Sequence, residues 1–248
     1  MADEIRDAKS CKAMESSHSS SGASGRYQVG HPCDSIVLVP SHADESASHR
    51  REIMEKEVLL AGMGGQGIQL AAKTLSLAAV AAGREVMLFG AYGGSMRGGN
   101  SESTVVIGDQ PILSPPSVTR AGFAIGMHPD YWPGVAARLI PGAVAVVNSG
   151  IFQGNQSPTD RHFYEIDMFA VASRAGAASA GSMVALGVLA ALTSIVGVED
   201  LTASIPEALP PYRQNRVSQN VDAVLAGAAA VGGAILDCWQ TGELRATT

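Results

Sequence analysis

Short apolar runs alternate with longer helical patterns from residue 57 to about residue 240. The runs predict strands over 57–61, 84–90, 101–109, 121–127 and 142–150, because glycine, proline or polar residues bound each of them. After the first run, apolar residues recur at steps of three and four, which predicts a helix over 67–83 that ends at Gly83. A shorter helix is expected over 130–139. This alternation predicts the α/β class, with an open, mostly parallel sheet and helices on both faces.

The pattern becomes more helical after residue 180. Residues 181–197 are apolar almost all round, which predicts a buried helix that could also lie at a subunit interface. A short helix over 197–210 and a long one over 216–236 should follow. We therefore expect one domain over 57–240 with a helical C-terminal portion, and a frayed tail over 241–248.

The first 56 residues differ in kind from the rest. They contain "ESSHSSSGASGR", four of the six histidines, and no periodic apolar residues outside "SIVLVP". This composition predicts a disordered extension over 1–56, with an added docking or linking arm as the alternative. The spacing of the four histidines fits neither a helix face nor a tight turn, so we predict no metal site there.

Charge and cysteine usage exclude several classes of protein. The chain has 248 residues and a net charge of −6, and Lys73 is the only lysine after Glu57, which argues against a nucleic-acid partner. Three distant cysteines without a CxxC pair argue against an iron–sulfur cluster or an ordinary zinc site, and they suit a reducing cytoplasm. Serine and threonine interrupt the richest apolar stretch, 181–198, so no membrane span is expected.

A glycine-rich segment follows the first predicted strand and precedes the first helix. Its residues Gly62, Gly64, Gly65, Gln66 and Gly67 satisfy G-x-G-x-x-G, a pattern that allows a tight turn and leaves helix N–H groups pointing outward. A dinucleotide site also needs an acid at the end of the second strand, and "VMLFGAYGG" has none there. No GK[ST] follows either. A free-standing dinucleotide-binding oxidoreductase stays open as an alternative.

A second glycine-rich segment follows the second predicted strand. Tyr92, Gly93, Arg97, Gly98 and Gly99 belong to it, and it should share the carboxyl edge of the sheet with the first segment. The Arg97 guanidinium could bind a phosphate or carboxylate bidentately, or pair with a carboxylate across an interface.

The chain lacks the side chains of a self-sufficient catalyst. His128 stands near no serine or cysteine nucleophile motif, and we predict a hydrogen-bonding surface residue there. Cys238 is expected to be a small buried residue. No catalytic residue is assigned, and the two glycine-rich segments are typical of a binding protein.

Taken together, "EVLLAGMGGQGIQLAAKTLSLAAVAAG", "AYGGSMRGGNSESTVVIGDQPILSPPS" and "IPGAVAVVNSG" resemble the gamma subunit of 2-oxoacid:ferredoxin (acceptor) oxidoreductases. The resemblance spans residues 57–233 in order. It implies a complex that decarboxylates pyruvate, 2-oxoglutarate, a branched-chain 2-oxoacid or indolepyruvate on thiamine diphosphate with Mg, and passes electrons through iron–sulfur clusters to ferredoxin or another acceptor. Coenzyme A takes up the acyl group.

The resemblance also implies which parts belong to this chain. The thiamine and cluster residues belong to the alpha and beta partners, with a delta subunit as a further candidate. The gamma part packs against them, closes over the site and helps to position coenzyme A through the two glycine-rich segments. Many relatives carry an acid where this chain has Ser95, which leaves the substrate subtype open. A purely structural assembly domain is the third hypothesis.

Overall fold

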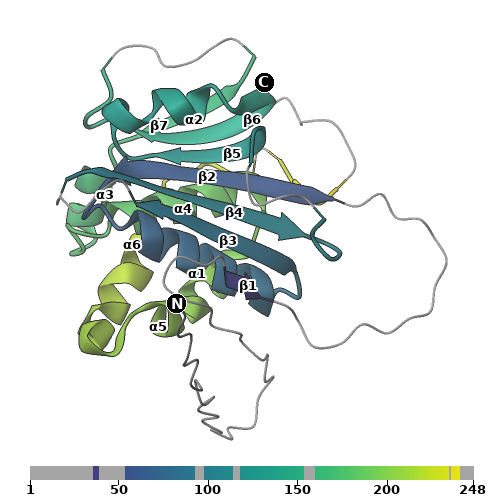
Figure 1. Cartoon of the computed structure of the whole chain (residues 1–248). Coiled ribbons are helices and arrows are strands. Elements are labelled where there is room, and N and C mark those ends of the chain that lie inside the picture. Colours follow the sequence, from purple (N-terminus) through teal and green to yellow (C-terminus); the bar gives the residue numbers. More distant parts are fainter. Residues whose placement is uncertain are drawn as a thin grey trace, which may run out of the picture.

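Seven strands form one sheet in the order β1-β3-β4-β2-β5-β6-β7 (Figure 1). The computed structural model describes residues 36–38, 54–92, 98–113, 118–153, 160–234 and 236–240. The strands are β1 (Ile36–Leu38), β2 (Glu55–Met63), β3 (Glu85–Tyr92), β4 (Asn100–Gly108), β5 (Ala121–Gly126), β6 (Leu139–Asn148) and β7 (His162–Ile166).

Five of the seven strands point the same way, which confirms a mostly parallel sheet. β2, β5, β6 and β7 pair in parallel, whereas β4 is antiparallel to both of its neighbours, β2 and β3. β3 therefore runs in the direction of β2 but does not touch it. The connection between β3 and β4, residues 93–99, is too short for a parallel crossover, which needs about a dozen residues or more. β4 consequently returns as the second strand of a hairpin.

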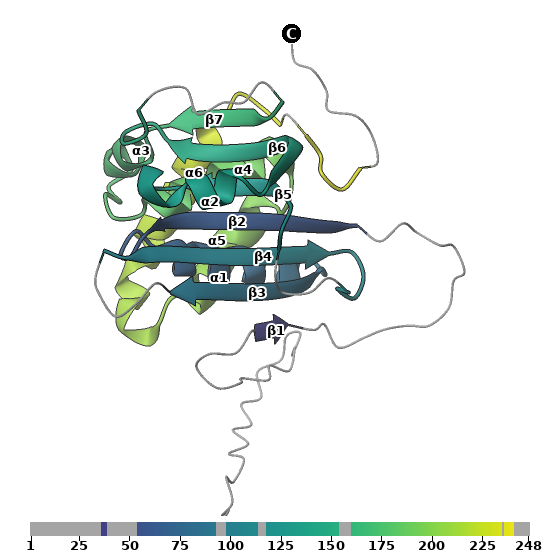
Figure 2. The ribbon, with the colours of Figure 1, turned by 45° about the horizontal axis from the view of Figure 1, so that its top comes forward.

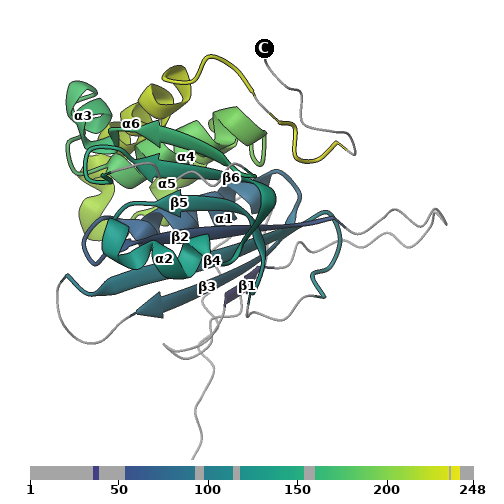
Figure 3. The ribbon, with the colours of Figure 1, turned by 90° about the horizontal axis from the view of Figure 1, so that it is seen from above.

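Helices cover the two faces of the sheet unequally (Figure 3). One face packs against α1 (Ile68–Ala81), α3 (Met168–Arg174), α4 (Gly181–Thr193), α5 (Val198–Ala208) and α6 (Val217–Ala229). The other face carries η1 (Pro129–Tyr131) and α2 (Pro133–Ala136), which pack with Trp132 and Phe152 over β5 and β6. The expectation of helices on both faces is confirmed. α4 is buried along almost its whole length, as its apolar sequence predicts.

β1 departs from the expectation of disorder over residues 1–56. It pairs antiparallel with β3, from Ile36 opposite Leu88 to Leu38 opposite Val86, and it lies beyond β3 in Figure 2. Its apolar triplet favours a strand, and the pairing covers backbone groups that an edge strand would expose. Residues 1–35, 39–53 and the predicted tail 241–248 lie outside the described residues.

Some element boundaries differ from the sequence prediction. β7 and α3 were not predicted, and α6 ends at Ala229 instead of residue 236. The helix expected over 130–139 is divided into η1 and α2 by Trp132. In the described part of the chain, no helix has the length and apolar character needed to cross a bilayer.

Candidate functional site

The first glycine segment turns the chain from the end of β2 into α1. Gly65 and Gly67 have φ values of 104° and 83°, in the left-handed region that favours glycine. The Gly67 carbonyl accepts the Ala71 N–H, and the Ser182 hydroxyl of α4 approaches the same carbonyl at 3.4 Å. Because the N-cap residue Gly67 has no side chain, the first N–H groups of α1 have no side-chain cap.

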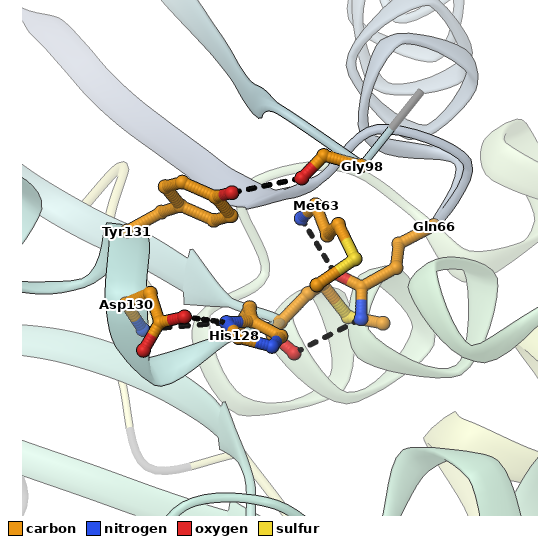
Figure 4. Close-up of polar contacts among 7 residues, drawn as sticks. Met63, Gln66, Gly98, His128, Asp130 and Tyr131 are labelled. Carbon is orange, nitrogen blue, oxygen red and sulfur yellow. Dashed lines mark hydrogen bonds and ion pairs between the residues drawn. The ribbon is translucent and has the colours of Figure 1, made fainter. Parts of the chain in front are cut away.

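Gln66 folds back over the end of the sheet (Figure 4). Its Oε1 accepts the Met63 N–H at 2.7 Å, and its Nε2 donates to the Met127 carbonyl at 3.4 Å. Both ends of the amide are thus used within the chain. Gln66 ties the end of β2 to the end of β5, and its contacts shape the loop.

The second glycine segment lies directly against the first. The Gly64 N–H donates to the Gly99 carbonyl at 2.8 Å, and Met63 pairs with Asn100 across β2 and β4. Gly62, in the same strand pair, lies opposite Ser101. The expectation that the two segments share one edge of the sheet is confirmed, and we call this edge the glycine rim (residues 62–67 and 98–99).

Only part of the second glycine segment lies within the described residues. Tyr92 is the last residue of β3, while Gly93 and Arg97 lie outside the described residues. Gly98 accepts a hydrogen bond from the Tyr131 hydroxyl at 2.9 Å (Figure 4). Tyr131 therefore anchors the hairpin end to η1, a contact that sequence reasoning missed.

His128 caps η1 beside the glycine rim. Its Nδ1 accepts the Asp130 N–H at 3.3 Å and lies 3.7 Å from the Asp130 carboxylate, and its ring packs near Tyr131. The predicted hydrogen-bonding role is confirmed, but the side chain is half-buried and does not lie fully at the surface. Among the described residues, no serine or cysteine forms a hydrogen bond with His128, so the rim offers no nucleophile–histidine pair.

A cavity of about 640 Å³ opens beside the rim. Gly65 and Gly67 form one wall, the start of α4 a second, and η2 (Pro211–Arg216) with the start of α6 a third. Arg213 and Arg216 line it, and sequence reasoning missed both. The absence of any acidic residue between Glu207 and Asp222 in a stretch with two arginines could have indicated them.

The shifted titratable groups lie at the other end of the sheet. Burial raises the pKa of Glu57 near the start of β2 and of Glu85 at the start of β3. It also raises the pKa of the Cys238 thiol to about 12. Cys238 is buried, as the sequence predicted. Within the described residues, no group of three histidine, cysteine, aspartate or glutamate side chains could hold a metal ion.

The geometry of the glycine rim disfavours the dinucleotide alternative. In a dinucleotide fold the strand after the first helix lies beside the first strand and supplies the acid that holds the ribose. Here β4 separates β3 from β2, and the Gly64 N–H is already bonded to Gly99.

The model of the pyruvate ferredoxin/flavodoxin oxidoreductase family matches residues 57–230, well over half of the chain. The chain belongs to this family. It is 32% identical over 164 residues to the 2-oxoglutarate synthase subunit KorC of Methanocaldococcus jannaschii, covering 65% of this chain and 87% of that one. The KorC subunit of Methanothermobacter marburgensis is 29% identical and is covered to 95%.

Solved structures of the family share the fold. The gamma subunit of the keto/oxoacid ferredoxin oxidoreductase from Geobacter sulfurreducens is 26% identical with a TM-score of 0.60, covering 70% of this chain and 94% of that one. The 2-oxoglutarate:ferredoxin oxidoreductase of Magnetococcus marinus is 20% identical with a TM-score of 0.65, and 33% of its chain is covered. Within the pyruvate ferredoxin/flavodoxin oxidoreductase family, this chain is a gamma-type subunit.

Proposed function

We propose that this chain is the non-catalytic gamma subunit of a thiamine-diphosphate-dependent 2-oxoacid:ferredoxin oxidoreductase complex. The complex oxidatively decarboxylates a 2-oxoacid, transfers the acyl group to coenzyme A and passes two electrons to ferredoxin or a similar acceptor. Alpha and beta subunits, with or without a delta subunit, hold the thiamine diphosphate, Mg and iron–sulfur clusters. The glycine rim packs against these subunits and helps to position coenzyme A.

The contact between the two glycine segments is the observation that carries this proposal. Gly64 and Gly99 bring two loops from different strands to one edge of the sheet, where open α/β sheets usually bind ligands. The edge is low in bulk, so a partner backbone or an extended ligand can approach closely. Arg97, which the sequence places one residue before Gly98, supplies a cation for that ligand or partner in this proposal.

Co-purification and turnover test the proposal. The tagged chain, expressed in its native host, should retain the alpha and beta subunits, and the complex should reduce a dye only with a 2-oxoacid and coenzyme A. The isolated chain should not reduce the dye, and dye reduction should appear when the alpha and beta subunits are added to it. Dye reduction by the isolated chain, or retention of an unrelated set of proteins, would overturn the assignment.

A purely structural role is the second candidate, because Gly64 and Gln66 direct their hydrogen bonds inward. Arg97→Ala separates the two roles in the assembled complex. A ligand role predicts a raised KM for coenzyme A with the subunits still associated, whereas a structural role predicts weaker assembly with an unchanged KM. Arg120→Ala is the matched control, since Arg120 is exposed and precedes β5 at the opposite edge of the sheet.

A further inference from the structure

β3 is covered by a neighbouring strand along its whole length on one side but only in part on the other (Figure 2). β4 pairs with all eight residues of β3, Glu85–Tyr92, whereas β1 pairs with only three of them, residues 86–88. Beyond these three, no described strand flanks β3 on the side of β1, and Phe89, Gly90 and Ala91 are exposed. The backbone of β3 from Phe89 onward is therefore an open sheet edge.

This edge lacks the charges that usually keep sheet edges apart. Residues 86–92, which we call the β3 edge, read VMLFGAY, and Glu85 just before them is the only charged residue of the strand. β7, at the other edge of the sheet, has exposed His162 and Glu165 among its five residues. An uncharged apolar edge pairs readily with another strand, so the β3 edge needs a cover.

β1 is a weak cover for the β3 edge. It has three residues and stands last in the strand order, so it pairs on one side only in the described part of the chain. Three backbone pairs stabilise it little, because ordering three residues opposes them with a free energy of similar size. Asp34 and Pro40 flank the apolar triplet, and strands are depleted in both residue types. β1 can therefore leave β3 while the other six strands stay paired.

Two copies of the β3 edge fit each other in an antiparallel register. Opposite residues of an antiparallel pair point to the same face of a sheet. A two-fold axis perpendicular to the sheet meets this condition, and it keeps the helices of both copies on one side. When the axis passes through the pair formed by Phe89 and its counterpart, all seven residues 86–92 pair in reverse order. Glu85 then lies outside the paired segment in both copies, so no like charges face each other.

The side chains are complementary in size in this register. Leu88 packs with the core under the helices, and it lies opposite Gly90 of the second copy. On the other face, Met87 lies opposite Ala91 of the second copy, so a large residue meets a small one on both faces. The two Phe89 side chains meet at the axis, and aromatic cross-strand pairs stabilise antiparallel sheets.

β1 blocks this pairing almost completely. Because the register is symmetric, covering residues 86–88 in both copies leaves only the pair at Phe89. Registers shifted toward Tyr92 avoid β1 but hold at most three pairs. We infer that the β3 edge pairs with the same edge of a second copy of this chain when β1 is released, and that β1 keeps the chain from dimerising in this way. The inference does not depend on the proposed function.

Two full-length variants that release β1 test the inference. I36P/V37P puts proline at adjacent positions, so the backbone N–H that faces β3 is lost whichever of the two it is, and I36D/V37D puts charge into β1 instead. S46P/A47P is the matched control, because both residues belong to the N-terminal extension but not to β1.

Sedimentation equilibrium over a concentration series measures the association of the 25.5 kDa chain. Both release variants should dimerise with a Kd about a hundredfold below that of the wild type and of the control. The reason is that the pairs rise from three to seven, and each added backbone hydrogen bond changes Kd by a few-fold.

Charge at Phe89 tests the register. In the I36P/V37P background, F89K places two like charges opposite each other at the axis and should restore the monomer, as should F89E. A mixture of the two charged variants should form a heterodimer, which a non-specific apolar contact would not do. Phe89 is 38% exposed, so both changes should leave the fold intact, and far-UV circular dichroism checks this.

Three results would overturn the inference. They are a folded I36P/V37P that stays monomeric, a dimer that F89K leaves unchanged, and association beyond the dimer. The last one counts because each copy has a single β3 edge, so two-fold pairing closes the assembly. If the proline variant does not fold, I36D/V37D decides in its place.

Discussion

Gly187 marks the closest approach between α4 and α6. A Cβ atom at this position would lie 2.0 Å from the Val224 carbonyl oxygen and 2.9 Å from its carbonyl carbon. Gly227 on α6 approaches α4 equally closely, since a Cβ atom at Gly227 would lie 2.1 Å from the Val184 carbonyl oxygen. Both obstacles are backbone atoms, so no side-chain rotation can relieve the clash. Gly187→Ala must therefore push the two helices apart.

The required displacement sets the size of the effect. Ordinary Cβ contacts begin near 3.4 Å, so α6 has to move by more than 1 Å along that contact. Overpacking of a buried contact typically costs about 1–3 kcal/mol, and a backbone clash belongs at the upper end. The higher helix propensity of alanine returns about 1 kcal/mol. We expect a net loss of about 2 kcal/mol or more, which lowers Tm by about 4–8 °C in a domain of this size.

Urea unfolding followed by far-UV circular dichroism measures this loss. Gly134→Ala is the matched control, because Gly134 is helical and nothing lies within 4 Å of its Cβ position. It should be neutral or slightly stabilising. Adding Gly227→Ala to Gly187→Ala should cost less than the sum of the single changes, since the first already separates the helices. Wild-type stability in Gly187→Ala would refute the close crossing on which this reasoning rests.

Three further predictions concern single side chains. Cys238 in the folded chain should react with iodoacetamide at pH 8 about a thousandfold more slowly than in urea, because its pKa rises from 9.0 to about 12; mass spectrometry of the Cys238 peptide measures this, and equal rates would contradict it. Because burial raises the pKa of Glu57, the folded state binds more protons there, and this contribution to stability falls as pH rises through the folded pKa. Glu57→Gln should therefore be more stable than wild type in urea at pH 7, with the gain shrinking below pH 4.5; a gain that grows in acid would be the wrong sign. Tyr131→Phe removes the bond to Gly98 and should cost about 1 kcal/mol in urea unfolding, while raising the KM for coenzyme A in the complex more than it lowers kcat; an unchanged KM would confine Tyr131 to stability.

The fold was predictable where burial imposes a strong pattern. β2 and α1 are buried along a strand and a helix face, and their sequences show the matching periods. β7 was missed because it is a short edge strand in which exposed His162 and Glu165 interrupt the apolar residues, so no apolar run marks it. The antiparallel direction of β4 was missed as well. An apolar run looks the same in either direction, and only the length of the connection between β3 and β4 distinguishes a hairpin from a crossover.

The candidate site was predictable only as far as it is local in sequence. Each glycine segment follows a strand directly, so their common edge could be inferred before any coordinates were known. Arg213 and Arg216 come about 150 residues after Gly65, and they reach the cavity because η2 leads into α6, which packs against α4. No local pattern encodes that packing. The one sequence feature available was the run of residues without an acid around the two arginines.

The glycine pattern itself shows why the sequence motif alone does not distinguish between the two functions. A dinucleotide loop and the loop from Gly62 to Gly67 share G-x-G-x-x-G, and both turn a strand into a helix. The difference lies in what the backbone bonds to. Here the Gly64 N–H binds Gly99 of a hairpin that stands where a dinucleotide fold has its second parallel strand. The loop is therefore braced by its neighbour, and its residues Gly65 and Gly67 also form one wall of the cavity that Arg213 and Arg216 line.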